Sequence, residues 1–131
     1  LSDSICTGLQ LANFCQDIAN DADRGRLYVP LDECRMFEVD FVHILDRKSG
    51  PALEKLLHYQ IVRAYKHLQA GSDLPSRLEG KLRSSVRLFI HGGFQILASL
   101  QRDPLAALRG RVKLSAKQKW ATLWSARKGL W

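Results

Sequence analysis

Four side chains with oxygen atoms recur at one-turn intervals near the start of the chain: Gln10, Asn13, Asp17 and Asp21. Because an α-helix turns by about 100° per residue, the four fall within an arc of about 80° on one helix face. Mg²⁺ binds carboxylate and amide oxygens, keeps some of its waters and completes its shell with phosphate oxygens. The spacing therefore predicts a metal site at Asn13, Asp17 and Asp21. A solvated acidic face is the alternative.

The rest of this segment is suited to burial. Residues 1–23 contain four Asp but no Lys, Arg or Glu, whereas a typical surface helix carries a broad face with Lys and Glu. A carboxylate is costly to bury unless a cation or hydrogen bonds compensate its charge. Arg24 and Arg26 follow directly, and guanidinium groups bind phosphate oxygens in a bidentate manner. Metal ligands beside phosphate ligands are what a magnesium–diphosphate site requires, although arginines after a helix are more often solvated.

The composition is that of an ordinary globular protein. Of 131 residues, 46% are apolar and 25% are charged, and the net charge is +7. No apolar run approaches the ~20 residues that span a bilayer, and the first residues lack the pattern of a signal peptide, so we expect a cytoplasmic protein. Cys6, Cys15 and Cys34 follow no metal-binding spacing, and we expect buried or half-buried free thiols.

Helical periodicity dominates the chain and predicts an all-α bundle with short connections. The predicted helices cover residues 2–22, 31–36, 39–45, 51–70, 76–101, 103–108 and 115–131, with Ser2, Ser76 and Ser115 as N-caps and Pro51 in a first turn. The predicted core set of the fifth helix is Leu82, Val86, Phe89, Ile90, Phe94 and Leu97. Gly92 and Gly93 mark a tight helix crossing or a kink.

The acidic stripe and the arginines belong to a longer pattern. It reads Gln10-Leu-Ala-Asn13-Phe-Cys-Gln-Asp17-Ile-Ala-Asn-Asp21-Ala-Asp-Arg24-Gly25-Arg26-Leu-Tyr28-Val-Pro30. This stretch resembles the second aspartate-rich motif of squalene/phytoene synthases, the head-to-head branch of the trans-isoprenyl diphosphate synthases. The later segments Arg87-Leu-Phe-Ile-His-Gly-Gly93 and Leu114-Ser-Ala-Lys117 resemble the squalene or hydroxysqualene synthases of the hopanoid pathway.

The resemblance implies a fold, a cofactor and a set of roles. The fold would be the helical bundle of the isoprenoid synthases, and the cofactor would be Mg²⁺. Asn13, Asp17 and Asp21 would hold the metal, and the two aspartates would be the catalytic positions. Arg26 would be the foremost diphosphate contact, with Arg24, Gln10 and Tyr28 as further candidates. Asn20 stands where many members carry an acidic residue, and it receives no ligand role.

The implied reaction ionises farnesyl or presqualene diphosphate and yields squalene or hydroxysqualene. An enzyme of the phytoene synthase type is an alternative. No glycine-rich dinucleotide fingerprint is present, so no NADPH site can be argued.

The first aspartate-rich motif of the family has no counterpart in these 131 residues. We therefore expect one partial domain, the C-terminal half of the fold, with the second motif at residues 13–21. On its own this chain is expected to be inactive, and a non-catalytic remnant is the alternative.

The end of the chain is basic and rich in tryptophan. Residues 109–131 hold seven Lys and Arg, no acidic residue, and Trp120, Trp124 and Trp131 on one helix face. This pattern is compatible with peripheral contact with a membrane surface, but packing of the tryptophans on the bundle is the preferred interpretation. No nucleic-acid recognition motif is found, so a basic nucleic-acid-binding module is only an alternative.

Overall fold

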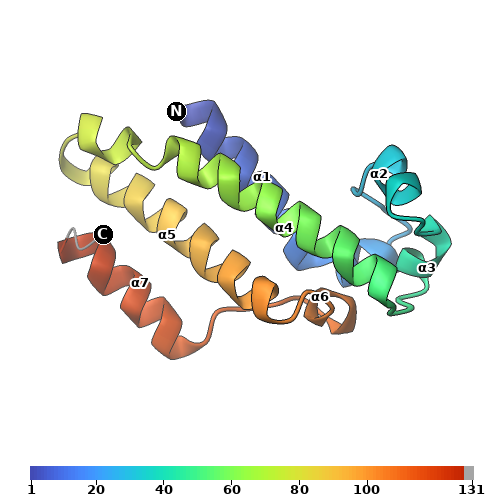
Figure 1. Ribbon diagram of the computed structural model, residues 1–131. Helices are drawn as coiled ribbons and strands as arrows, with labels where there is room; N and C mark the ends of the chain where they lie inside the picture. Colours follow the sequence, from blue (N-terminus) through green and yellow to red (C-terminus); the bar gives the residue numbers. More distant parts are fainter. Residues whose placement is uncertain (129–131) are drawn as a thin grey trace.

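The structure, a computed structural model, describes residues 1–128, with side chains as far as residue 124. This part of the chain contains helices and no strand (Figure 1), which confirms the predicted all-α class. The elements are α1 (Ser2–Asp23), α2 (Leu31–Met36), α3 (Phe41–Leu45), α4 (Pro51–Gly71), the 3-10 turn η1 (Leu74–Arg77), α5 (Gly80–Arg102), α6 (Ala106–Arg109) and α7 (Ala116–Lys128).

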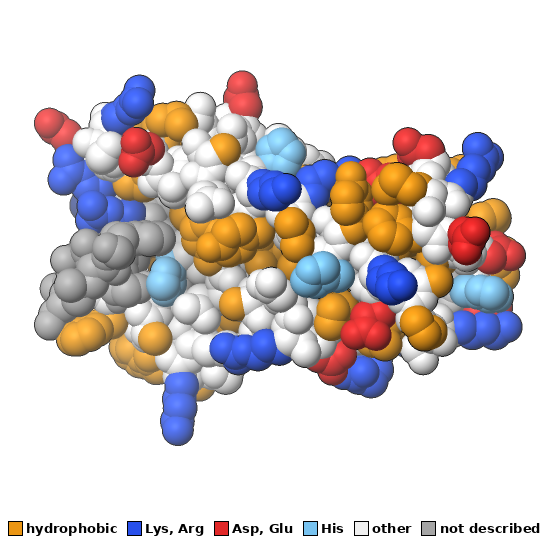
Figure 2. Space-filling model, in the orientation of Figure 1, with side chains coloured by type: hydrophobic (Ala, Val, Ile, Leu, Met, Phe, Trp, Pro, Cys, Tyr) orange, Lys and Arg blue, Asp and Glu red, His pale blue; other side chains and the backbone are white. Residues whose placement is uncertain are grey.

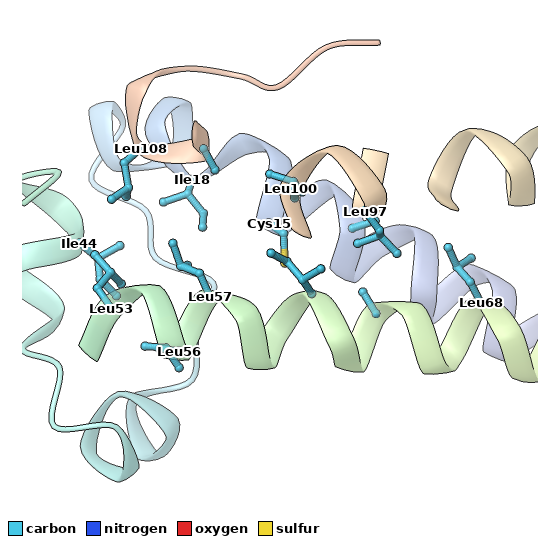
Figure 3. Packing of buried hydrophobic residues seen from close by; sticks show 14 of the residues in the cluster. Cys15, Ile18, Ile44, Leu53, Leu56, Leu57, Leu68, Leu97, Leu100 and Leu108 are labelled. Carbon is cyan, nitrogen blue, oxygen red and sulfur yellow. The ribbon is translucent and has the colours of Figure 1, made fainter. Parts of the chain in front are cut away.

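The long helices α1, α4 and α5 pack side by side, and α7 lies along α5 (Figure 1). The short helices α2, α3 and α6 lie at the end of the bundle where α4 begins. Figure 3 shows apolar side chains of α1, α4 and α5 pointing toward one another to form the core. Its largest fully buried members are Ile44, Leu56, Leu57, Ile61, Leu68, Ile90, Leu97 and Leu100. The motif helix is therefore held by a large apolar contact with α4.

Two glycines allow the long helices to approach closely around Leu68. A Cβ atom at Gly8 of α1 would lie 2.7 Å from the backbone nitrogen of Leu68, and one at Gly93 of α5 would lie 2.8 Å from its Cδ1 atom. Gly92 has no neighbour within 4 Å of such an atom. The tight crossing predicted at the glycine pair is therefore confirmed for Gly93, and α5 continues through both residues.

Most helix boundaries are close to the predicted ones, but two of the three predicted caps are wrong. Ser2 lies inside α1, which starts without a side-chain cap at Leu1, and Ser76 lies in η1, so that α5 begins only at Gly80. Ser115 does cap α7: its Oγ accepts from the Gln118 amide at 3.2 Å, and Gln118 Oε1 accepts from the Ser115 amide at 2.8 Å. This reciprocal pair is a capping box.

The predicted core set of α5 is only partly correct. Ile90 and Leu97 are buried, but Leu82 and Phe89 are each 59% exposed. Further exposed apolar side chains on α4 include Tyr59 and Tyr65, and Figure 2 shows apolar surface between basic residues on the face formed by α4 and α5. The helical period predicted that Leu82 and Phe89 are buried because both lie on the apolar face of α5. The period does not show whether another helix covers that face at each position.

The structure also tests the predictions about membrane-spanning segments and cysteines. Among the described residues, no helix has both the length and the apolar character needed to cross a membrane. All three cysteines are free thiols; Cys15 and Cys34 are buried, but Cys6 is exposed, contrary to the expectation.

The close crossing predicts opposite effects for two Gly→Ala substitutions. Both Gly8 and Gly92 lie in helices, where alanine is favoured by about 1 kcal/mol. Gly8→Ala also forces a methyl group against the Leu68 backbone, and overpacking of this kind costs about 1–3 kcal/mol. In urea unfolding we expect Gly8→Ala to be less stable than the parent chain and Gly92→Ala to be equal or more stable. Equal effects of the two substitutions would contradict the crossing.

The burial of two cysteines predicts selective thiol labelling. Burial raises the pKa of the Cys15 thiol to about 12 and also raises that of Cys34. A raised pKa keeps a thiol protonated at pH 8, and the thiolate is the reactive form. We expect iodoacetamide to label one thiol, Cys6, in the folded chain and three in denaturant. Cys6→Ser should abolish labelling of the folded chain, and rapid reaction of a second thiol would contradict this arrangement.

Candidate functional site

The stripe predicted on the first helix lies along one side of α1, and its members differ in exposure. Gln10 and Asn13 are exposed, Asp21 is half-buried, and the Asp17 side chain is 24% exposed. Asn20, which received no ligand role, is exposed beside the stripe. Both carboxylates of the stripe are therefore partly enclosed.

The Asp17 carboxylate contacts a basic residue that was not predicted from the sequence. Arg111 lies after α6, and its Nε atom is 3.0 Å from Asp17 Oδ1. The neighbouring residue fixes the same segment to α1, because Gln16, which is buried, donates from Nε2 to the carbonyl oxygen of Val112. No local pattern marked Arg111, since it lies more than 90 positions after Asp17 and only the fold brings them together.

The Asp17 oxygen that Arg111 contacts has an ion pair but no hydrogen bond among the described residues. Oδ1 is buried and has no hydrogen-bond partner in the described part of the chain, since the Arg111 guanidinium is close but not aligned for a hydrogen bond. A buried oxygen without a partner is costly unless a cation or a donor reaches it. With Asn13 and Asp21 one turn away on either side, this carboxylate suits a hard divalent cation.

The loop after α1 turns back onto the end of that helix. The amides of Arg24 and Arg26 both donate to the carbonyl oxygen of Asp21, at 3.0 and 2.8 Å. Gly25 lies between them with φ of 65°, a conformation that favours glycine. The turn keeps Arg26 beside Asp21, while the side chains of both arginines remain exposed.

Tyr28 fixes the next part of the loop against α1. Its ring stacks on Phe14 with centroids 4.4 Å apart and planes 2° from parallel. A small pocket of about 20 Å³, roughly the room for one water, lies beneath the loop. Its lining combines polar and apolar side chains: Leu11, Phe14, Cys15, Ile18, Asp21, Arg26, Leu27, Tyr28, Val29 and Gln60. The predicted residues Asp21, Arg26 and Tyr28 therefore share one pocket.

A polar cluster seats α2 against α4 next to this pocket. The Glu33 carboxylate accepts from Arg63 and from Gln60, and Arg63 donates to Gln60 Oε1 at 2.6 Å. Gln60 is buried, and the side chains of Glu33 and Arg63 are only 13% and 30% exposed. Because α2 begins directly after Pro30, this cluster anchors the far end of the loop that carries Arg26 and Tyr28.

The structure thus brings some predicted residues together and leaves others apart. Asp21, Arg26 and Tyr28 line one pocket, and Asp17 lies next to Arg111. Gln10, Asn13 and Arg24 are exposed and do not line this pocket. Within residues 1–128, no group of three His, Cys, Asp or Glu side chains is placed to hold a metal ion. Metal binding here would thus need Asn13, water or substrate oxygens as ligands.

The polar cluster predicts a coupling between Glu33 and Arg63. Hydrogen bonds to charged groups contribute about 1.5–3 kcal/mol, and partial exposure of Arg63 lowers the expected coupling to about 1–2 kcal/mol. A double-mutant cycle with Glu33→Ala and Arg63→Ala, followed by urea unfolding, measures it. The matched control is the exposed pair Asp103 and Arg109, for which less than about 1 kcal/mol is expected. Equal coupling in the two pairs would contradict the role of the cluster.

The chain is similar to known proteins of one family. The family model described as squalene/phytoene synthase matches residues 1–118. The chain is similar to the phytoene synthase of Arthrospira platensis, with 28% identity over 87% of this chain and 37% of that protein. It is similar to the hydroxysqualene synthase of Sinorhizobium fredii, with 31% identity over 87% of this chain and 39% of that protein.

A solved structure matches as well. The squalene synthase HpnC of Alicyclobacillus acidocaldarius superposes with a TM-score of 0.75 and 32% identity, over 79% of this chain and 39% of that one. The chain therefore spans about two fifths of the length of these relatives.

Proposed function

Because the chain belongs to the squalene/phytoene synthase family, we propose that α1 and the loop after it bind Mg²⁺ and the diphosphate group of a prenyl diphosphate. The substrate would be farnesyl or presqualene diphosphate. The observation that carries the proposal is the Asp17 carboxylate, whose buried Oδ1 has no hydrogen bond among the described residues and lies 3.0 Å from Nε of Arg111. A site for a cation and a polyanion needs both features.

The oxygens of Asn13, Asp17 and Asp21 would hold the metal. They follow one another at intervals of about 6 Å along the helix axis, so that ions held by the same diphosphate can bind to neighbouring turns. Bound Mg²⁺ would neutralise the diphosphate and stabilise the negative charge that the leaving group gains.

The arginines would bind the remaining phosphate oxygens. Arg26 lines the pocket beside Asp21, and Arg24 lies two residues before it in the same loop. Arg111 comes from the segment after α6 and contacts Asp17. Their guanidinium groups donate pairs of hydrogen bonds to phosphate. Gln10 and the Tyr28 hydroxyl are further donors. In the proposed reaction the C–O bond to the diphosphate breaks, its electron pair leaves with the diphosphate, and these cations stabilise that charge.

Capture of the carbocation by water would give hydroxysqualene, and its reduction by a hydride donor would give squalene. The slightly higher identity to the hydroxysqualene synthase and to HpnC than to the phytoene synthase supports these products. Phytoene synthesis remains the second candidate, supported by the phytoene synthase from Arthrospira platensis among the relatives.

We propose further that the 131 residues alone bind the diphosphate without completing the reaction. The pocket at Asp21 has room for about one water, whereas two prenyl chains need an enclosed apolar cavity to protect a carbocation. Binding is therefore the measurement that tests the site in this chain.

We predict magnesium-dependent binding of a non-hydrolysable farnesyl diphosphate analogue, measured by isothermal titration calorimetry. Asp17→Ala and Asp21→Ala should each weaken it about tenfold or more, since loss even of groups that only orient metal ligands costs about 10–100-fold. Asp73→Ala, which removes an exposed carboxylate between α4 and η1, is the matched control and should bind like the parent chain.

Three outcomes would contradict the proposed site. One is binding of equal strength in EDTA. Another is equal loss of binding in Asp73→Ala, which would point to net charge. The third is no binding at all by a folded chain, which would favour a non-catalytic remnant.

A further inference from the structure

The net positive charge of the chain resides in its C-terminal segment. Residues 104–131 hold seven Lys or Arg and no acidic residue: Arg109, Arg111, Lys113, Lys117, Lys119, Arg127 and Lys128. The whole chain has 20 basic and 13 acidic residues, so residues 1–103 carry equal numbers of each sign and the segment accounts for the net +7. Arg109 and Arg111 pair with Asp103 and Asp17, whereas Lys113, Lys117 and Lys119 are exposed.

The outward face of α7 is apolar at its centre. Thr122 is buried, and Gln118 donates from Nε2 to Ser99 Oγ at 3.5 Å, so this side of α7 faces α5. Trp120, Leu123 and Trp124 are 72%, 50% and 59% exposed.

The three apolar residues share one face of the helix. At about 100° per residue they fall within an arc of about 100°, roughly opposite Thr122. The two exposed tryptophans contradict the preferred interpretation of the sequence, in which they packed on the bundle; Trp131 lies outside the described residues.

Lysines flank this apolar strip on both sides. By the same helical geometry, Lys119 lies about 40° beyond Leu123, and Lys117 lies about 20° beyond Trp124. Both lysines are exposed. A tryptophan-rich strip between two basic edges is the arrangement of helices that lie in the plane of a membrane surface, with the apolar strip toward the acyl chains and the lysines at the headgroups.

The match to the family model stops just before this face. The squalene/phytoene synthase match ends at residue 118, and Trp120, Leu123 and Trp124 all follow it.

We propose that the outward face of α7 docks on an anionic lipid membrane. The exposed Lys113, Lys117 and Lys119 complement a negative surface, and each Lys or Arg close to such a surface strengthens binding about fivefold. Lipid is favoured over nucleic acid because Leu123, at one edge of the strip, can bury in acyl chains but cannot stack on a base. The proposal is independent of the diphosphate site.

Intrinsic fluorescence gives a direct measurement, because all three tryptophans of the chain lie at residues 120–131. The purified chain is titrated with vesicles of phosphatidylcholine alone and of phosphatidylcholine with about 30% phosphatidylglycerol, and binding is checked by flotation. We expect a blue shift and flotation with the anionic vesicles only, and weaker binding as salt rises.

Paired variants separate the charge from the apolar strip. Lys117→Gln with Lys119→Gln should weaken vesicle binding by about 25-fold, about fivefold per lysine. The matched control, Lys55→Gln with Lys66→Gln, removes two exposed lysines from α4 and should leave it unchanged. Leu123→Ser should reduce the blue shift and the flotation, whereas Leu82→Ser, at an exposed leucine of α5, should not. Circular dichroism verifies that each variant is folded.

Several results would overturn the proposal. Equal binding to neutral and anionic vesicles, or no binding to either, contradicts it outright. Equal losses in the α4 and α7 lysine variants assign the effect to net charge. A blue shift that depends on protein concentration without vesicles assigns the face to a second copy of the chain. Tighter binding of a single-stranded oligonucleotide than of anionic vesicles assigns it to nucleic acid.

Discussion

The partly buried Asp17 carboxylate needs a positive charge close to it, and the rest of the site is arranged around this requirement. The carboxylate is mostly enclosed on α1, and one of its oxygens has no hydrogen bond among the described residues. Arg111 supplies a positive charge at 3.0 Å from a distant part of the sequence. A guanidinium that already balances a carboxylate can also bind phosphate oxygens. The same pair thus links α1 to the segment before α7 and prepares a surface for a polyanion.

The rest of the bundle holds the parts of this site in place. The close crossing at Leu68 fixes the axis of α1 relative to α4 and α5, because Gly8 and Gly93 leave no room for larger side chains. At the other end of α1, Arg47 pairs with Asp23 and donates to the carbonyl oxygen of Ala19 at 3.0 Å. This places a positive charge at the helix C-terminus, where it is favourable. The orientation of the stripe is therefore set by packing at one end and by charge at the other.

The sequence predicted local features well and long-range ones poorly. Local sequence was enough to predict the stripe, the break at residues 24–30 and most helices. One-turn spacing, Gly25 and Pro51 each affect the conformation of residues close to them in the chain. Arg111 was missed because its contact with Asp17 depends on where the chain returns. The Glu33 cluster was missed for the same reason. Phe89 was assigned to the core because periodicity shows a shared face but not what covers it.

The central claim is that a divalent cation binds at the α1 stripe together with diphosphate. Paramagnetic relaxation by Mn²⁺, used in place of Mg²⁺ with inorganic pyrophosphate on the ¹⁵N-labelled chain, locates the ion most directly. The account predicts that amide signals of Asn13, Asp17 and Asp21 broaden first, and that excess Mg²⁺ restores them. Broadening centred on other acidic residues, or equal broadening without pyrophosphate across all exposed carboxylates, would contradict it.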